Sequence, residues 1–433
     1  MKRVAITTMG CKVNAYDSAH IRGSLQDGVE MVPFSDEADV YVINTCTVTN
    51  NSDSEARKLI RRSKRRNPDA VTIVTGCYAT VAAKELSEVE GVDYVFGNAD
   101  KAEVSKAILA GPQRQGDAPI LQVSDINAVD EVRHVDAAMF EGYTRAYLKV
   151  QEGCMYRCTY CIIPYSRGGS SRSVPLAQCV TQARELAAAG YRELVLTGVH
   201  IGSWGHEYDL ILADLVEALT EVDGIERIRI SSIDSPELHP RLVELVAHHP
   251  KVATHVHVCL QSGSDGVLQR MGRVYDAASY REAVSHLVLQ NPDICVGTDI
   301  IVGFPGETDE EFSETVALLE DTPIHHYHVF TFSPRRGTPA ADMPGIVHGD
   351  VMRARSRTLR DMGGRRKAQW AARFEGRRME ALFEQTRSEG TKGRARNYFE
   401  IRVPDDVPAG QIRHVDVLSV DRHGQGHGRL VTV

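Results

Sequence analysis

Hydrophobic positions in the first part of the chain form short β-branched runs separated by helical stretches. Three runs, at 4–9, 39–44 and 71–75, have the continuous apolar character of buried parallel strands. Helical patterns at 16–27 and 53–66 lie between them. This alternation predicts a parallel sheet with helices on both faces, which is an α/β fold.

A second and longer βα series begins near residue 145. Its strands are expected at 145–150, 193–197, 227–231, 255–260, 295–302 and 326–332. Its helices are expected at 175–189, 210–221, 240–248, 277–289 and 309–321. This series predicts an incomplete (βα)6 barrel, whose functional site lies at the carboxyl ends of the strands.

The rest of the chain differs from both series. A stretch rich in Gly, Pro, Gln and Asp predicts a linker at 113–139. Short alternating strands with Gly turns predict a small antiparallel β-barrel, with strands at 379–384, 398–403, 413–420 and 429–433. We therefore divide the chain into an N-terminal domain, a linker, a barrel and a C-terminal domain, at 1–112, 113–139, 140–368 and 369–433.

Length and charge agree with this division and exclude several classes of protein. At roughly 150 residues per domain, 433 residues predict about three domains. No apolar run approaches the ~18 residues that span a bilayer, and Met1-Lys2-Arg3 begins no secretory signal. We therefore expect a cytoplasmic protein without a membrane partner. Because the net charge is −8, nucleic-acid contacts would be local, as in the basic segments 57–66 and 353–378, which otherwise are solvated helix faces.

Three cysteines occupy equivalent positions just after the strands of the first sheet. These are Cys11, Cys46 and Cys77, hereafter the N-terminal trio. Because the carboxyl ends of parallel strands share one edge of a sheet, the three can meet at one point. We interpret the three cysteines as ligands of a metal cluster. The alternative is that each is a small, buried hydrophobic residue. Three further cysteines are interpreted as packing residues, namely Cys179, Cys259 and Cys295.

A second cysteine group follows the first barrel strand directly. Cys154, Cys158 and Cys161, hereafter the central trio, form a C-x3-C-x2-C motif. Three thiolates on so short a loop suit three irons of a [4Fe–4S] cluster and leave the fourth iron open to a small molecule. Zinc is the alternative, but it prefers four ligands, and the sequence has no second C-x2-C pair.

The central trio resembles the signature of the radical S-adenosylmethionine (SAM) enzymes, C-x3-C-x-aromatic-C, with Tyr160 at the aromatic position. The resemblance implies a [4Fe–4S] cluster that binds SAM and a barrel whose strand ends hold it. The residues it places near SAM are Tyr160, Gly198, His200, Ser232, Gln261, Ile301 and Gly303. Ordinary turn chemistry at strand ends is the alternative for each, and Thr298–Gly303 lacks the first Gly of the corresponding family motif.

With both trios, the chain resembles the methylthiotransferase family over essentially its whole length. Further matches are Cys161-Ile-Ile-Pro-Tyr-Ser-Arg-Gly168, Leu260-Gln-Ser-Gly-Ser264 and Phe332-Ser-Pro-Arg-Arg-Gly-Thr-Pro339. The resemblance implies a flavodoxin-like N-terminal domain, a radical SAM barrel and a C-terminal TRAM domain that binds RNA. It also implies two [4Fe–4S] clusters, SAM as methyl donor and radical source, tRNA as substrate, and a reductant such as flavodoxin or ferredoxin.

The segment Gly10-Cys-Lys-Val-Asn14 resembles the family branch that modifies C2 of N6-threonylcarbamoyladenosine next to the anticodon of tRNA. Other branches act on N6-isopentenyladenosine or on a ribosomal protein aspartate, and a non-catalytic iron–sulfur RNA-binding protein is an alternative of another class. The threonylcarbamoyl carboxylate calls for a cationic or hydrogen-bonding partner, for which Lys12, Arg335 and Arg336 are candidates. The alternative is that Lys12 is solvated and that other residues determine the branch. The run 325–328 is rich in histidine, but strand alternation separates neighbouring side chains, so we expect no metal site there.

Overall fold

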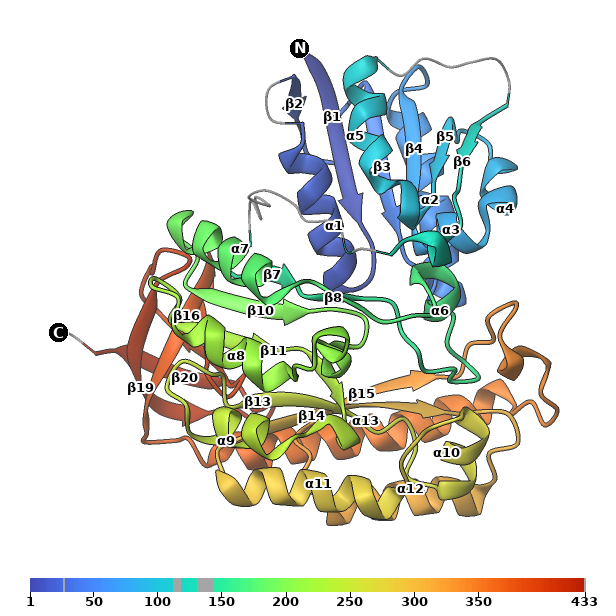
Figure 1. Ribbon diagram of the computed structural model, residues 1–433. Helices are drawn as coiled ribbons and strands as arrows, with labels where there is room; N and C mark the ends of the chain where they lie inside the picture. Colours follow the sequence, from blue (N-terminus) through green and yellow to red (C-terminus); the bar gives the residue numbers. More distant parts are fainter. Residues whose placement is uncertain (26–27, 112–117, 131, 133–142, 432–433) are drawn as a thin grey trace.

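The first six strands form one parallel sheet at the N-terminus of the computed structural model, which describes residues 1–25, 28–111, 118–130, 132 and 143–431 (Figure 1). The strands are β1 (Lys2–Thr8), β2 (Val29–Met31), β3 (Val40–Thr45), β4 (Val71–Gly76), β5 (Tyr94–Phe96) and β6 (Ile120–Gln122). Their order, β2-β1-β3-β4-β5-β6, contains the flavodoxin-like arrangement that the sequence predicts. Every residue of β3 and β4 is buried, which explains their unbroken apolar runs.

Five helices pack against this sheet. They are α1 (Lys12–Gly23), α2 (Asn50–Arg66), α3 (Cys77–Val81), α4 (Ala83–Ser87) and α5 (Lys101–Ala110). The expected linker at 113–139 is partly wrong, because β6 pairs with β5 and forms the edge of the sheet. Much of the remaining linker lies outside the described residues.

The central barrel consists of two adjoining parallel sheets, ordered β7-β10-β11 and β12-β13-β14-β15. Its strands are β7 (Ala146–Lys149), β10 (Glu193–Thr197), β11 (Arg227–Ile230), β12 (Ser232–Asp234), β13 (His255–Cys259), β14 (Cys295–Val302) and β15 (His326–Thr331). An isolated parallel bridge joins Ile228 of β11 to Val252, three residues before β13, and brings the two sheets side by side. The third predicted strand, 227–231, ends at Ile230 as β11, β12 follows it as a strand that the sequence did not predict, and the other strands of the barrel are the predicted ones.

Helices surround the barrel, and most begin and end close to the predicted residues. They are α6 (Ile163–Arg167), α7 (Leu176–Ala188), α8 (Leu212–Thr220), α9 (Pro240–His248), α10 (Asp265–Met271), α11 (Ala277–Gln290), α12 (Asp309–Asp321) and α13 (Gly349–Ala372). Two short strands, β8 (Gln151–Glu152) and β9 (Arg172–Ser173), form an antiparallel pair that flanks the central cysteine loop. None of the described helices combines the length and the apolar character needed to cross a membrane.

The C-terminal domain is a closed five-stranded barrel in the order β16-β17-β18-β20-β19. Its strands are β16 (Arg378–Arg387), β17 (Gly390–Ala395), β18 (Glu400–Val403), β19 (Ile412–Val420) and β20 (Gly426–Leu430). The prediction of a purely antiparallel barrel is wrong in one place, because β18 and β20 pair in parallel. The sequence also misses β17 and places the last strand at 429–433, of which 432–433 lie outside the described residues.

The C-terminal barrel docks at the end of the central barrel where the parallel strands begin (Figure 1). Glu193, fully buried on β10, is within ion-pair distance of Arg145, Arg227 and Arg229, at 2.9, 3.3 and 2.8 Å. Arg227 also contacts Glu380 of the C-terminal barrel at 2.6 Å. The two barrels therefore share a buried charged interface. Trp370, near the end of α13, packs in the core of the C-terminal barrel, so this core begins just after the expected boundary at 368.

Candidate active site

The N-terminal trio lies at the carboxyl edge of the first sheet, as the sequence predicts. Cys11 immediately precedes α1, Cys46 follows β3, and Cys77 begins α3 directly after β4. Gly10 has a φ of 89°, and a Cβ there would lie 2.8 Å from Cys46 Sγ. Glycine is needed where the backbone is left-handed and passes this close to another side chain. The Cys11 loop is thereby brought directly against Cys46.

Asn14 fixes the relative positions of these two loops. Its buried side-chain Nδ2 donates hydrogen bonds to the carbonyl oxygens of Met9 and Thr45, at 2.8 and 3.0 Å. Met9 and Thr45 lie beside Cys11 and Cys46 in the sequence. A buried amide that satisfies two backbone carbonyls makes the cysteine positions rigid.

Burial and the neighbouring thiols of the N-terminal trio act on Cys46. Burial raises the pKa of Cys46 to about 11, and the Cys77 and Cys11 thiols act in the same direction. Because it is the thiolate that ligates metals, a cationic metal group would favour the ionised form of Cys46. This chemistry suits an iron–sulfur cluster.

The central trio lies on the loop between β8 and α6. Thr159 anchors this loop to the barrel, since its backbone N–H donates to the Met271 carbonyl at 2.9 Å and its hydroxyl donates to the Arg270 carbonyl at 2.8 Å. The Cys161 N–H donates to the Cys158 carbonyl at 3.0 Å, which forms a tight turn. Three sulfurs are thus presented by one short, anchored segment.

Charged side chains border the central trio. Arg273 Nη1 lies 3.2 Å from Cys158 Sγ. Burial raises the pKa of Cys161 to about 12. Burial alone would lower the pKa of His200, but contacts with Cys154 and Glu237 raise it to about 10. The loop therefore has cationic partners ready for anionic sulfur.

Neither trio has the spacing of a single-ion site. Across the described residues, the one group of three His, Cys, Asp or Glu side chains whose ligand atoms all lie within 4.8 Å of one another is elsewhere. At least two sulfurs of each cysteine trio are therefore farther apart. Bound at 2.3 Å to one tetrahedral zinc, sulfurs would be about 4 Å apart. The wider spacing fits a cluster that offers one iron to each sulfur.

A buried charged network joins the N-terminal domain to the central cysteine loop. Asp17 of α1 forms ion pairs with Lys101, Lys149 and Arg167, the latter two at 3.0 Å. Arg167 also contacts Glu152 at 2.8 Å. Burial would raise the pKa of Asp17, but the surrounding cations hold it well below its ordinary value. The network therefore keeps Asp17 ionised and binds the two domains together.

Asn98 connects the two cysteine trios more directly. Its Nδ2 lies 3.7 Å from Cys77 Sγ and donates to the Ser166 carbonyl at 2.7 Å. Ser166 is in α6, the helix that follows the central trio. The two cysteine loops are thus linked through a single side chain.

Three of the residues expected near SAM line one cavity of about 220 Å³ next to Cys161. They are Tyr160, Gln261 and Ile301, and Phe332 and Asp299 are among the other residues that line it. Gln261 has a φ of 71°, unusual for a residue other than glycine, and its backbone bonds to Asp299 and Ile301 of β14. Backbone strain of this kind is characteristic of functional sites. We call this the aromatic cavity.

The other four expected SAM residues lie elsewhere. Gly198 and His200 border Gln151, whose Oε1 accepts from the His200 N–H at 2.8 Å, on the Cys154 side of the loop. Ser232 is exposed on β12. Gly303 has a φ of 76°, and a Cβ there would lie 2.2 Å from Met352, so this glycine allows close packing against α13.

A second cavity of about 130 Å³ lies inside the barrel and has a largely basic wall. We call it the lumen cavity; among its lining residues are Lys12, Arg145, Arg229, His255, His257, His326, His328 and Tyr398. Alternation along β13 and β15 places every second histidine inside. The sequence analysis missed Arg145, Arg229, His255 and His257, although the His-x-His pattern of β13 was a usable signal.

Lys12 differs from the two arginines of the lumen cavity in its electrostatic partners. Lys12 is exposed to solvent where it borders the cavity, and the protein packed around its ammonium, followed by Arg229, lowers its pKa. Arg145 and Arg229 share Glu193 as an ion-pair partner. No ion pair between described residues involves Lys12. An anionic ligand would complement it.

The other two candidates for the substrate carboxylate differ from Lys12. Arg335 is buried and already engaged, because its guanidinium contacts Thr47, Asn50 and Asp53. These contacts fix the loop after Cys46 to the barrel and occupy both terminal nitrogens of Arg335. Arg336 is exposed.

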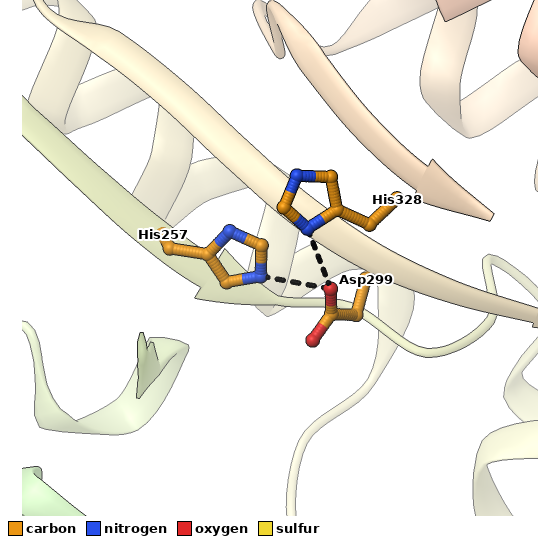
Figure 2. A group of neighbouring side chains, drawn as sticks. All are labelled: His257, Asp299 and His328. Atoms are coloured by element: carbon orange, nitrogen blue, oxygen red, sulfur yellow. Dashed lines mark ion pairs between the residues drawn. The ribbon is translucent and has the colours of Figure 1, made fainter. Parts of the chain in front are cut away.

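The leftover cysteines behave mainly as predicted. Cys179 and Cys295 are fully buried packing residues. Cys259 is only partly buried, because it ends β13 at the open end of the barrel. The histidine run also splits as alternation requires, but His328 meets His257 and Asp299 from neighbouring strands (Figure 2).

Comparison with known proteins first defines the class. Residues 148–319 match the model of the radical SAM superfamily, and residues 3–97 match that of the uncharacterized protein family UPF0004. Among solved structures, the radical SAM methyltransferase TsrM from Kitasatospora setae is similar, with a TM-score of 0.58 and 18% identity. The similarity covers 78% of this chain and 77% of that one, and it defines the fold alone.

Curated relatives define the family. The threonylcarbamoyladenosine tRNA methylthiotransferase MtaB of Bacillus subtilis is 39% identical over 100% of this chain and 97% of its own length. MtaB of Aquifex aeolicus is also 39% identical, over 88% of this chain and 92% of its own length. A tRNA-2-methylthio-N(6)-dimethylallyladenosine synthase of Methylobacillus flagellatus is 33% identical, over 94% of each. The chain belongs to the MtaB family of radical SAM methylthiotransferases.

Membership of this family defines the cofactors as two [4Fe–4S] clusters and SAM. The cysteines agree with a count of two clusters, since the chain offers two groups of three cysteines, and all six cysteines lie in segments that follow strands.

Proposed function

We propose that this protein adds a methylthio group to C2 of N6-threonylcarbamoyladenosine next to the anticodon in tRNA. SAM serves as methyl donor and as radical source. The observation that carries the proposal is the 39% identity to a named MtaB over the whole chain. Both cysteine trios and Lys12 fall within that match.

The six cysteines are assigned as cluster ligands, with the N-terminal and central trios each holding one [4Fe–4S] cluster. Their spacing, their strand-end loops and the cationic residues nearby support this assignment. When bound, the clusters and SAM supply radical chemistry, which an adenine C–H needs because it is too weak an acid for a side-chain base.

The chain's own residues position the reactants. Tyr160, Gln261 and Ile301 bind SAM from the walls of the aromatic cavity beside Cys161. His200 lies against Cys154 and offers a cationic hydrogen-bond donor there. Gly198, Ser232 and Gly303 lie outside the walls of the aromatic cavity, so we assign Gly198 to loop packing near Gln151 and Gly303 to packing against α13.

Lys12 determines which hypermodified base is accepted. A threonylcarbamoyl group carries a carboxylate, whereas an isopentenyl group is apolar, and the lumen cavity is bordered by Lys12, Arg145 and Arg229. A site built to bind such a group discriminates strongly against an analogue that lacks it, because its own polar atoms are left unpaired. The isopentenyl alternative is therefore disfavoured.

Contacts with the rest of tRNA are expected to be electrostatic. Arg61, Arg62 and Arg65 are exposed on α2, and the C-terminal barrel exposes Arg413 and Arg422. Such side chains bind phosphates and make affinity depend on salt. Flavodoxin or ferredoxin is the proposed reductant, and the tRNA substrate places the reaction in the cytoplasm.

Analysis of tRNA nucleosides by mass spectrometry tests the proposal. A strain that lacks the gene should lose 2-methylthio-N6-threonylcarbamoyladenosine and accumulate the unmethylthiolated form. The wild-type gene and Cys179→Ala should restore the product, because Cys179 lies in the helix core outside both trios. Cys46→Ala or Cys158→Ala should restore none. An unchanged nucleoside profile in the deletion strain would contradict the proposal.

A further inference from the structure

Three neighbouring barrel strands each contribute one side chain to a compact trio. His257 comes from β13, Asp299 from β14 and His328 from β15 (Figure 2). Asp299 is paired directly with His328 in the parallel register, and His257 is paired with Gly297 two residues away. Alternation therefore directs all three side chains to the same face, inside the barrel.

The ligand atoms of this trio converge. His257 Nε2 and His328 Nδ1 lie 3.1 and 3.3 Å from the same oxygen, Asp299 Oδ1. All three atoms are within 4.8 Å of one another. Two donors bound to one ion at 2.0–2.2 Å lie about 2.9 to 3.4 Å apart, for angles between octahedral and tetrahedral. The observed separations have the size of a coordination site.

The buried imidazole nitrogen of His257 is not satisfied by an ordinary hydrogen bond. His257 is 8% exposed, and its Nε2 has no aligned hydrogen-bond partner among the described residues. Asp299 Oδ1 contacts this nitrogen at 3.1 Å as an ion-pair neighbour. A buried polar atom left in this state is costly and needs an explanation. A metal ion between the three ligands would supply the missing partner.

We propose that His257, Asp299 and His328 bind one divalent transition-metal ion, separate from both iron–sulfur clusters. Two imidazoles and one carboxylate form a donor set that zinc and non-haem iron(II) accept. Three protein ligands leave further coordination positions open. His257 and His328 border the lumen cavity, whereas Asp299 borders the aromatic cavity. The ion therefore lies between the two cavities and can take an oxygen ligand from the lumen.

The surrounding charges suit an ion that also binds an anion. Asp299 supplies one negative charge to the ion, and Glu193 balances the nearby Arg229. Lys12 lies on the same cavity without an ion-pair partner in the described structure. A carboxylate in the lumen would face the ion and Lys12 together.

Zinc binding to the complete protein tests the proposal independently of any reaction. The reconstituted full-length protein, with both clusters filled, is dialysed anaerobically against Zn²⁺, and zinc and iron are counted by mass spectrometry. Because the cysteines are then occupied by iron, we expect about one zinc per chain with unchanged iron. X-ray absorption at the zinc edge should show only nitrogen and oxygen ligands at about 2.0–2.2 Å.

Variants locate the site. His328→Ala should lose the zinc, and the half-exposed position of that side chain means that the fold should tolerate the change. His257→Ala should lose it as well. His248→Ala is the matched control, because His248 contacts Glu244 at 3.8 Å without a third ligand, and it should retain the zinc. Absence of zinc from the wild type, zinc retained in His328→Ala with full iron, or a sulfur shell at 2.3 Å would each overturn the proposal.

Discussion

Replacing Lys12 by Gln should weaken the reaction with threonylcarbamoyladenosine tRNA selectively. The substitution keeps most of the side-chain length and removes the one lumen cation that has no ion-pair partner in the described structure. A hydrogen bond between charged groups contributes about 1.5–3 kcal/mol. At about 1.4 kcal/mol for each factor of ten, kcat/KM should fall roughly tenfold to a hundredfold.

Initial rates of methylthiolation on tRNA bearing the modified base measure this loss. SAM cleavage without tRNA should be unchanged, because Lys12 is not among the residues lining the aromatic cavity. Iron content must be determined as well, since Lys12 follows Cys11. Lys106→Gln, which removes an exposed lysine paired with Glu103 at 2.8 Å, is the matched control and should react normally. Unaltered kcat/KM in Lys12→Gln with full iron would refute the assigned role of Lys12.

Three further predictions concern the clusters and the buried charges. Replacing the central trio by Ala should remove about half of the reconstituted iron and abolish SAM cleavage. Replacing the N-terminal trio by Ala should remove the other half of the iron and leave SAM cleavage measurable. Assays of iron and of 5′-deoxyadenosine test both outcomes. Asp17→Asn should reduce the free energy of unfolding by about 3–5 kcal/mol, because Lys101, Lys149 and Arg167 lose their shared anion, while Glu55→Gln in an exposed pair should change it little. The pKa of Glu193 is held at about 2, since its arginine partners outweigh burial, so its stabilisation is present above pH about 4.5 and is lost as the pH falls towards 2. Destabilisation by Glu193→Gln relative to wild type should therefore shrink by about 3 kcal/mol over that range, and a difference independent of pH would contradict it.

The sequence predicts the elements whose patterns are local. The runs at 193–197 and 295–302 became β10 and β14 at the predicted residues, because buried parallel strands need continuous apolar or β-branched character. Helices α9 and α12 likewise match, since Pro240 and Thr308 mark their starts. The two cysteine trios were predicted for a similar reason, because the local sequence pattern shows where each strand ends and which cysteine follows it.

Features that depend on distant pairing were missed. Strand β17 reads Gly-Thr-Lys-Gly-Arg-Ala and has little apolar character, so only its neighbours in the closed barrel define it. The parallel pairing of β18 with β20 follows from barrel closure rather than from any local pattern. The lumen cavity and the His257–Asp299–His328 trio likewise require the register of three separate strands. The ion pair between Arg335 and Asp53 was missed as well, because the two residues are far apart in the sequence.

Competition between two tRNAs tests the central claim most directly. One reaction contains the reconstituted enzyme, SAM, a reductant, and equal amounts of tRNA bearing threonylcarbamoyladenosine and tRNA bearing isopentenyladenosine. Nucleosides are then analysed by mass spectrometry. The account predicts that the methylthio group appears on the threonylcarbamoyl nucleoside in large excess, because only that base offers a carboxylate to the basic lumen. Methylthiolation confined to the isopentenyl nucleoside would contradict it.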